Sequence, residues 1–273
     1  MRKGISMKVV VCMKHILDPE LPPSSFEIEQ EKKQAKIGKH AFVLNPYDEN
    51  ALEMALQLKE KKEDAQIIAL TYGEAKAEES LRRALGVLAD EAVHIVQETD
   101  QQTDAYGTAK VLAACINAIG PVDLIMCGRM AGDWDAGLVG SILAEALSLP
   151  SVCFISSLEI NDDRLRVWRQ VEGGTEILES PLPALVTVTN DESNVLRIAK
   201  VRDVMKAHRK SIQKFTLSEL DVSDADTQRP NAYLELRDLY LPIQDNVCEF
   251  IEGEEPEEKI DALLTKLKAQ KVL

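Results

Sequence analysis

Short apolar runs alternate with helical segments along the first part of the chain, and this alternation constrains the fold more than any other feature. The runs are rich in Val, Ile and Leu, which is typical of strands buried on both faces of a parallel sheet. Segments with helical spacing separate them, so each connection crosses from one parallel strand to the next. The sequence predicts an α/β fold with an open, mostly parallel, doubly wound sheet. The runs are MKVVVCM (7–13), QIIALTY (66–72), EAVHIV (91–96), VDLIM (122–126) and SVCFI (151–155).

After Ser156 the runs become shorter, and several alternate in polarity. LEI, RLRVWRQV, TEILES and ALVTVT are separated by the turn signals NDDR and EGG, which predicts antiparallel strands at one edge of the sheet. The polar stretch 18–39 can hold a small hairpin. The helix after it is expected to begin at Pro46, with Asn45 as its N-cap and Asp48 in its first turn.

The C-terminal part of the chain is predicted to lie outside this domain. Asp221–Pro230 has the composition of a linker, and a helix from about Pro256 carries an apolar face. Residues 231–250 contain Leu and Tyr side chains with no obvious partner within the chain. We therefore expect an α/β domain over residues 7–220, followed over 221–273 by a linker, a C-terminal arm and a helix that pack on a partner.

Composition narrows the classes of function. The formal net charge of −14 argues against nucleic-acid binding. The five cysteines form no C-x-x-C pair, which fits a reducing compartment such as the cytoplasm. The four histidines have no metal-ligand spacing, so no metal site is expected. No apolar run reaches the roughly 18 residues of a membrane span, so no direct membrane insertion is expected.

The clearest candidate site is CGRMAGDWDAGLVG, from Cys127 to Gly140, which joins an apolar run to a helical pattern. Ligands of open parallel sheets bind at the carboxyl ends of the strands, where the junctions at 12–18, 72–73 and 128–140 all lie. In the last junction the amides of Gly137 to Gly140 stand at a helix start, where the dipole favours an anion. The alternative is a tight turn in which Asp135 caps the helix. The pattern is neither GxGxxG nor GxxxxGK[ST].

Asp133 and Asp135 admit several roles. Two carboxylates one residue apart can bind a metal or act as acid and base, but on a turn they more often cap a helix or accept from ribose hydroxyls. No Ser–His–Asp arrangement stands out, and Cys127 suits a small buried position. No catalytic residue is therefore assigned.

A basic segment, Arg197–Lys210, contrasts with the acidic chain. It is either a solvated helix face or a docking site for an acidic partner. Val201 lies between Lys200 and Arg202, so its side chain suits a small apolar pocket with an acidic rim. The alternative is that Val201 belongs to the buried face of a short helix.

Several of these stretches together resemble the beta subunit of electron-transfer flavoproteins. The resemblance implies a domain of the adenine-nucleotide-binding type and a heterodimer with an alpha subunit. It also implies FAD shared with, and mainly on, that alpha subunit, and an adenine nucleotide, usually AMP, buried in this chain. An acyl-CoA-type dehydrogenase and a downstream redox acceptor are the implied partners. The stretches, in the family's order, are VVVCMKHILD, LNPYDENALEMAL, VDLIMCGRMAGDWDAGLVG, EGGTEILESPLPALVTVT and DVMKAHRKSI.

The resemblance also assigns roles by position. Val201, five residues before Lys206, is implied to anchor the dehydrogenase, with Lys206 and Arg209 steering its approach. Trp134 stands where electron-bifurcating relatives, which bind a second FAD in place of AMP, tend to carry Gly. We therefore expect AMP and one FAD per heterodimer. The residues implied to border the nucleotide are Cys12, Asn45, Tyr72, Gly128, Asp133, Asp135, Gly137, Leu138, Val139 and Gly140.

Two other classes of function compete with this electron carrier, which has no substrate chemistry of its own. One is an ATP-cleaving, hydrolase-like α/β protein, although such enzymes usually place a Ser/Gly-rich loop after the first strand, where this chain has CMKHILDPE. The other is a nucleotide-sensing regulatory module. Flavin that copurifies after coexpression with an alpha subunit would distinguish the first reading from both.

Overall fold

The structure is a computed structural model that describes residues 7–22, 25–31, 33–35, 42–98, 103–223, 233–234, 236–241 and 248–273. It divides into two units. The first comprises Met1–Glu27 and Ala35–Arg237, and the second comprises Ile28–Gln34 and Asp238–Leu273. Each unit is described by itself. The predicted division at residue 220 stays a prediction.

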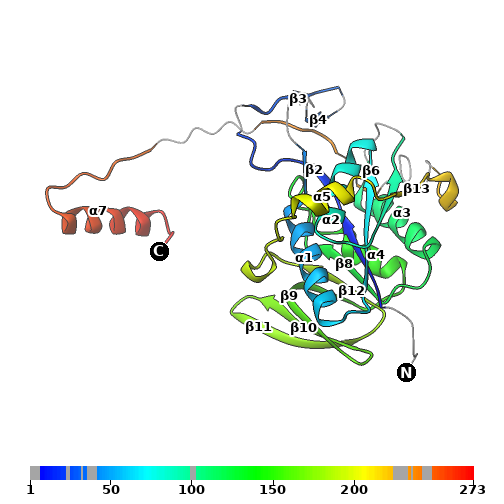
Figure 1. Ribbon diagram of the computed structural model, residues 1–273. Coiled ribbons are helices and arrows are strands. Elements are labelled where there is room, and N and C mark those ends of the chain that lie inside the picture. The colour runs from blue at the N-terminus through cyan, green and yellow to red at the C-terminus, as the bar shows by residue number, and fades with distance from the viewer. Residues whose placement is uncertain are drawn as a thin grey trace. The chain divides into compact units, whose positions relative to one another are not determined.

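A nine-stranded sheet forms the centre of the first unit, in the order β11-β10-β9-β12-β8-β1-β6-β7-β13 (Figure 1). The middle strands are parallel, as predicted. From β1 the chain proceeds outward through β6 and β7, and then crosses to β8 on the other side of β1. This reversal is a topological switch point, where open α/β sheets bind ligands. The strands are β1 (Lys8–Met13), β6 (Gln66–Gly73), β7 (Glu91–Val96), β8 (Leu124–Gly128) and β12 (Ala184–Val188).

The antiparallel strands lie at one edge, as predicted, but with one correction. The edge consists of β9 (Ser151–Asn161), β10 (Arg164–Val171) and β11 (Gly174–Pro181). The prediction that ALVTVT joins this antiparallel edge is wrong, because β12 lies parallel between β8 and β9. All five residues of β12 are buried, as expected of a central strand covered on both faces. At the other edge β13 (Gln213–Phe215) pairs with β7 in parallel.

Helices cover both faces of the sheet. The helices α1 (Pro46–Lys61), α2 (Glu78–Gly86) and α5 (Val201–Ala207) pack on one face. The other face carries α3 (Ala105–Ala118) and α4 (Val139–Ala146) (Figure 1). Alternate side chains of β1 therefore enter two separate cores: Val9 and Val11 pack under α1, while Val10 and Cys12 face α3 and α4.

Shorter elements complete the first unit. The strands β2 (His15–Leu17) and β5 (Phe42–Leu44) pair antiparallel beside the end of β1. The single-turn helices η2 (Ala75–Ala77), η3 (Glu192–Asn194) and η4 (Ser218–Leu220) lie in connections. None of the helices in the described part of the chain is long and apolar enough to cross a membrane.

The second unit holds the end of the chain. The helix α7 (Pro256–Ala269) begins at Pro256, as predicted, and buries none of its residues. Its apolar residues Ile260, Leu263 and Leu264 are exposed. The strands β3 (Ile28–Glu29) and β4 (Gln34–Ala35) form a two-stranded sheet in the stretch predicted to hold a hairpin.

Gly140, in the first turn of α4, is required by the packing of that helix on the sheet. A Cβ at this position would lie 2.6 Å from Cγ2 of Thr187 on β12. The hydroxyl of Thr187 accepts a hydrogen bond from the backbone N–H of Phe154 at 3.1 Å. Thr187 therefore lies between α4 and β9, and only a glycine lets the helix approach it.

We expect Gly140→Ala to lower the free energy of unfolding by about 1–3 kcal/mol through overpacking. Thr187→Ser removes the opposing methyl group and keeps the hydroxyl, so the double variant should be more stable than Gly140→Ala alone. Urea unfolding of the four proteins measures this coupling. A double variant no more stable than Gly140→Ala would contradict the contact.

Candidate functional site

The carboxylate of Asp48 joins two strands at the switch point. Its Oδ2 accepts from the backbone N–H of Lys14, just after β1, at 2.8 Å. Its Oδ1 accepts from the N–H of Gly128, at the end of β8, at 2.9 Å. Asp48 lies in the first turn of α1, where the helix dipole favours a negative charge. One buried side chain thus holds together β1, β8 and the start of α1.

Gly128 is explained by this packing. A Cβ there would lie 2.5 Å from Oδ1 of Asp48 and 2.6 Å from the carbonyl carbon of Tyr47. The group that closely approaches this glycine is therefore the first turn of α1. The role of Gly128 in cofactor binding stays a prediction.

Asn45 connects α1 to the loop after β8. Its Nδ2 donates to the carbonyl of Met130 at 2.9 Å, and its Oδ1 accepts from the N–H of Gly132 at 3.1 Å. Asn45 is the N-cap residue of α1, as predicted, but its side chain makes no capping hydrogen bond. Both polar atoms of the Asn45 side chain bond the loop after β8, and neither caps α1.

The loop contains no lysine, and the lysine that pairs with its Asp133 comes from the end of β1. Nζ of Lys14 lies 2.7 Å from Oδ2 of Asp133. Sequence reasoning missed this pair because 119 residues separate its members. The sequence gives one indication of this pair: Lys14 directly follows β1. Its side chain therefore lies at the edge of the sheet where the carboxyl ends of the parallel strands meet.

The start of α4 remains open. Leu138 is its N-cap and makes no side-chain hydrogen bond, so Asp135 does not cap the helix. Gly137 has φ +63°, a left-handed conformation that suits glycine and turns the chain into the helix. Within the described part of the chain, the amides of Gly137, Leu138 and Val139 donate to no protein acceptor. Such amides at a helix N-terminus can bind an anion.

Arg129 places a second positive charge at this edge, and sequence reasoning did not single it out. One guanidinium nitrogen is 3.2 Å from the hydroxyl of Thr189, and another is 3.2 Å from the hydroxyl of Tyr47. The guanidinium carbon lies 4.7 Å from the centre of the Tyr47 ring. Nε is buried and has no hydrogen-bond partner among the described residues. No described carboxylate forms an ion pair with Arg129, so its charge is balanced by no acid of the described residues.

Cys12 and Tyr72 lie on neighbouring strands at the same edge. Cys12 is buried, and it pairs in register with Cys127 across β1 and β8. A hydrogen bond with Cys127, together with burial, raises the pKa of the Cys12 thiol well above its usual value, so the thiol stays neutral. The Tyr72 hydroxyl lies 3.2 Å from the hydroxyl of Thr103, just before α3. The cofactor contacts of both residues stay predictions.

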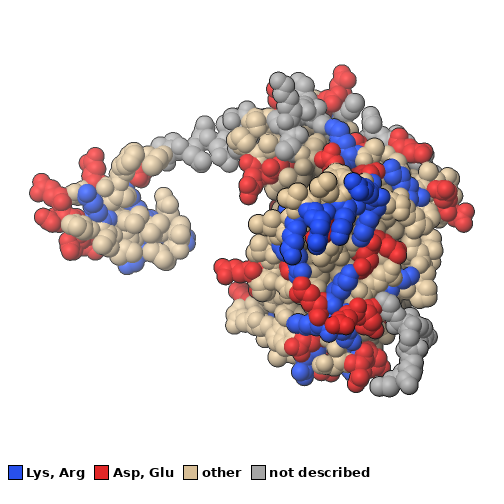
Figure 2. Space-filling model, in the orientation of Figure 1, with Lys and Arg blue, Asp and Glu red and all other residues tan. Residues whose placement is uncertain are grey.

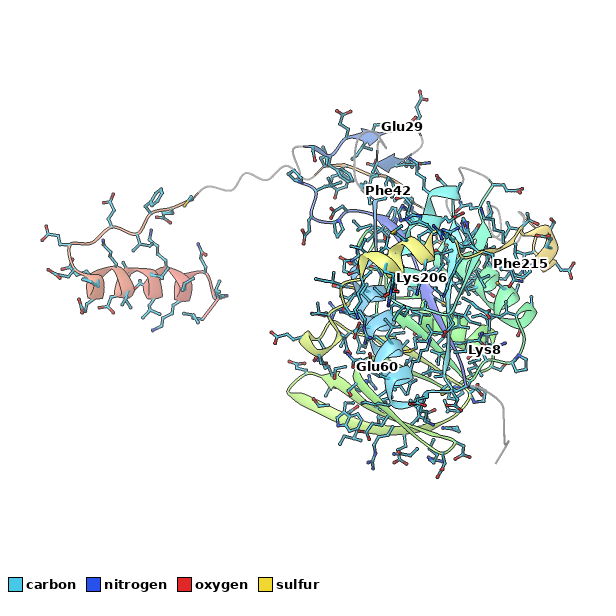
Figure 3. All side chains as sticks on the ribbon, viewed as in Figure 1. Lys8, Glu29, Phe42, Glu60, Lys206 and Phe215 are labelled. Atoms are coloured by element: carbon cyan, nitrogen blue, oxygen red, sulfur yellow. The ribbon has the colours of Figure 1, made fainter. Side chains whose placement is uncertain are left out.

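The basic segment 197–210 divides into a buried part and an exposed part. Arg197 points inward to Glu53, with a shortest distance of 2.7 Å, so it is structural. Asp203 and Ala207 of α5 are buried, whereas its outer side chains are exposed. Val201 begins the helix with 78% of its surface accessible, which overturns the buried-face alternative. Ile198, three residues earlier in the chain, is 95% accessible. Figure 2 shows Lys and Arg side chains gathered on the face that carries α5, and Figure 3 labels Lys206 there.

Arg209 is also exposed, and Lys206 lies 3.8 Å from the carboxylate of Asp203. The three predicted docking residues, Val201, Lys206 and Arg209, are therefore accessible and belong to one short segment. We call Val201–Arg209 together with Ile198 the α5 surface.

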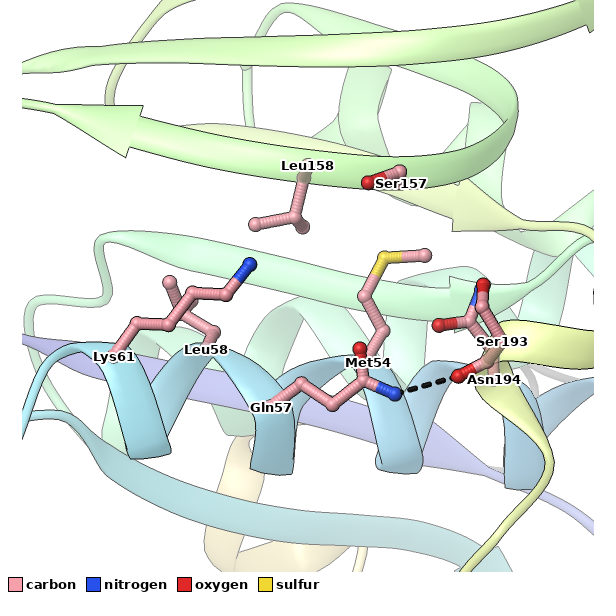
Figure 4. A pocket seen from close by; sticks show the side chains of 8 residues that line it. All are labelled: Met54, Gln57, Leu58, Lys61, Ser157, Leu158, Ser193 and Asn194. Carbon is pink, nitrogen blue, oxygen red and sulfur yellow. Dashed lines mark hydrogen bonds between the residues drawn. The ribbon is translucent and has the colours of Figure 1, made fainter.

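A shallow hollow lies elsewhere, between α1, β9 and η3 (Figure 4). Its volume of about 130 Å³ is below the roughly 300 Å³ of the smaller ligand pockets. The side-chain amide of Gln57 crosses it to donate to the carbonyl of Ser193 at 2.7 Å. None of its lining residues belongs to the junctions at the carboxyl ends of β1, β6 and β8, which together we call the strand-end site, so the hollow is separate from that site. Its lining is Met54, Gln57, Leu58, Lys61, Ser157, Leu158, Ser193 and Asn194.

Comparison with known proteins identifies the family. A family model described as the electron transfer flavoprotein domain matches residues 36–220. The electron transfer flavoprotein subunit beta of Bacillus subtilis is 34% identical over 265 residues, which cover 97% of this chain and 98% of that protein. The chain belongs to the electron transfer flavoprotein family. Within it, the chain belongs with the beta subunits, as the sequence resemblance indicated.

Two further relatives of the family match nearly the whole chain. The electron transfer flavoprotein subunit beta of Megasphaera elsdenii is 28% identical over 275 residues, covering 98% of this chain and all of that protein. Subunit CarD of the caffeyl-CoA reductase-Etf complex of Acetobacterium woodii is 30% identical over 269 residues, with coverage of 98% and 100%. The matched family region includes Asn45, the loop after β8 and the α5 surface.

The side chain of Asp48 and the two backbone hydrogen bonds that it accepts, which we call the Asp48 clamp, should make the free energy of unfolding depend on pH. Burial raises the pKa of Asp48 to about 7, partly opposed by the hydrogen bonds from Lys14 and Gly128. The folded protein therefore holds this proton more tightly than the unfolded chain, whose Asp titrates near 4. The stability that follows is fully present below pH about 4 and is lost as the pH rises to about 7.

Asp48→Asn should remove this dependence and lower the free energy of unfolding by about 1.5–3 kcal/mol, since an Asn cannot accept at both atoms. Urea unfolding from pH 4.5 to 8, for this variant and the unaltered chain, measures both effects. Asp123→Asn controls for the loss of a carboxylate hydrogen bond to β1, because Asp123 accepts from the N–H of Lys8 at 2.8 Å. A parallel pH profile for Asp48→Asn and the unaltered chain would contradict the assignment.

Proposed function

We propose that this chain is the beta subunit of a heterodimeric electron-transfer flavoprotein. In this role it helps pass electrons between a flavin dehydrogenase of the acyl-CoA type and a downstream redox acceptor. It is an electron carrier without substrate chemistry of its own. The observation that carries the proposal is an open, positive helix start at the switch point of a chain that belongs to this family.

The strand-end site suits an adenine nucleotide, which we propose to be AMP. The amides of Gly137, Leu138 and Val139 are placed to bind its phosphate. Asp133 is held by Lys14 and can accept from ribose hydroxyls. Cys12 and Tyr72 lie at the ends of the adjoining strands and can form the walls.

FAD is proposed to bind mainly on the alpha subunit, with this chain as one wall. FAD supplies the redox chemistry, since it takes up and releases electrons. Aromatic residues are only 4% of the chain, which fits a flavin ring held chiefly by another subunit. Arg129 supplies a fixed positive charge at the edge of the sheet where the two subunits would share the cofactor.

The arm is proposed to pack on the alpha subunit. Within the described residues of the second unit, the exposed apolar side chains include Tyr240, Leu241 and Phe250, in addition to the face of α7. Exposed apolar surface of this extent marks a protein–protein contact. The name of the CarD relative, a subunit of a complex, supports a multi-subunit assembly.

The nucleotide is tested by its release. Denaturation of the purified chain should release AMP, identified by mass spectrometry. Gly137→Asp should lower nucleotide content about 10-fold, because a carboxylate at the helix start repels the phosphate. Gly137→Asn is the matched control: it has the same shape, no charge, and tolerates the positive φ of this position. A folded sample without nucleotide, or equal losses in both variants, would contradict the phosphate site.

The flavin is tested by counting. Coexpression with an alpha subunit should yield one FAD per heterodimer, and little FAD should bind to this chain alone. Trp134, about half exposed on the loop after β8, is bulky for a second flavin ring at that place. Two FAD molecules per heterodimer would show that AMP was the wrong nucleotide.

The dehydrogenase is proposed to dock on the α5 surface. Val201 and Ile198 supply isolated apolar side chains, and the neighbouring cations complement an acidic partner. Burial of a Val side chain contributes about 1.5–3 kcal/mol. Val201→Ala should therefore cost about 1 kcal/mol of binding free energy, which is a several-fold loss of affinity for the partner. Charge reversal at Lys206 or Arg209 should instead slow association in a salt-dependent way.

Electron transfer to or from the dehydrogenase measures the effect of Val201→Ala, with FAD content and melting temperature recorded alongside. Val171→Ala, an exposed valine at the end of β10, is the matched control for the same truncation. Unchanged kinetics in a flavin-replete Val201→Ala protein would remove Val201 from the interface. Equal losses in both variants would make the effect non-specific.

A further inference from the structure

The residue that caps α3 also holds the start of the C-terminal arm. Oδ1 of Asp104 accepts from the N–H of Gly107 at 2.7 Å, which is an N-cap hydrogen bond. Oδ2 of the same carboxylate accepts from the backbone N–H groups of Tyr233 and Leu234, at 2.8 and 3.1 Å. Both arm residues belong to the first unit of the fold, so this contact lies within a single unit.

An aromatic contact supports the same attachment. The rings of Tyr106, in the first turn of α3, and Tyr233 lie with centroids 4.3 Å apart and planes tilted by 50°. Neither residue is buried: Tyr106 is 43% exposed and Tyr233 is 73% exposed. Burial therefore contributes little, and the charge-assisted hydrogen bonds of Asp104 are the main directional restraint. The dipole of α3 further stabilises the carboxylate that makes them.

Attachment at this point changes what the arm can do. A segment that is fixed at its start loses less conformational entropy when the rest of it binds a partner. It also presents the apolar residues beyond it at a high effective concentration near the domain. An arm whose first residues were not held by Asp104 would have neither advantage.

We propose that Asp104 is the anchor of the C-terminal arm and thereby a positioning residue for the alpha subunit. The anchor itself follows from the contacts of this chain. Its consequence for the partner rests on the proposed function, in which the arm packs on the alpha subunit. The anchor and its consequence are therefore measured by separate experiments.

Asp104→Ser tests the anchor in the full chain. A serine hydroxyl can still accept from Gly107 and cap α3, but it cannot also reach two arm amides. Hydrogen exchange at Tyr233 and Leu234 should become at least about 10-fold faster, with Gly107 still protected. Asp191→Ser is the matched control, because Asp191 caps η3 through the N–H of Ser193 and does not touch the arm.

Leu234→Pro is a second variant that leaves α3 unaltered. It removes one arm donor, so exchange at Tyr233 should again accelerate. Unchanged exchange at Tyr233 in both Asp104→Ser and Leu234→Pro would overturn the anchor.

Affinity for the alpha subunit tests the consequence. Asp104→Ser should raise the Kd about 10-fold, while Asp191→Ser should leave it unchanged. Faster exchange with unaltered affinity would overturn the positioning role and keep the anchor. Deletion of residues 231–273 tests the proposed function separately: a truncated chain that pairs normally would show that the arm does not hold the alpha subunit.

Discussion

The site depends on the two hydrogen bonds that the Asp48 carboxylate accepts. It accepts one hydrogen bond from each strand that flanks the switch point, and it starts the helix that covers them. Without it, two backbone N–H groups at the ends of β1 and β8 would lose their acceptor in a buried place. Gly128 is the complement of this clamp, since any side chain there would collide with Asp48. The loop after β8 therefore starts from a fixed point.

That fixed point, together with two further contacts, positions the loop. Asn45 holds the backbone of Met130 and Gly132, and Lys14 holds Asp133. Each contact spans more than eighty residues of sequence, so the loop is shaped by α1 and β1 rather than by its own composition. Its glycines have separate purposes: Gly128 and Gly140 allow close packing, and Gly137 allows a turn. A cluster of glycines is therefore a poor indicator of a ligand until the packing is known.

The sequence predicted local structure well and long-range structure poorly. Apolar runs and helical spacing located β1, β6, β7 and β8, and Pro46 marked the start of α1. The place of β12 could not be predicted, because strand order depends on pairing between distant segments. For the same reason the sequence places Asn45 correctly at the N-cap of α1 but does not show that its side chain bonds a loop more than eighty residues away. Two features of the site could be recognised only in the folded sheet. They are the ion pair between Lys14 and Asp133 and the charge of Arg129, which pairs with no described carboxylate.

The helix starts of this chain show why an external anion suits α4. An acidic side chain stands near the positive end of each of α1, α2, α3, α5 and α7: Asp48 and Glu49, Glu78 and Glu79, Asp104, Asp203, and Glu257 and Glu258. Among the described α-helices, α4 alone has no acid either at its N-cap or in its first turn. Its dipole and first amides are therefore not satisfied by the described chain. The chain has a net charge of −14, so acidic residues are abundant. The absence of an acid at the start of α4 is therefore specific to this helix. A phosphate group would supply the missing negative charge, and the position of α4 beside the switch point is where the fold would bring it.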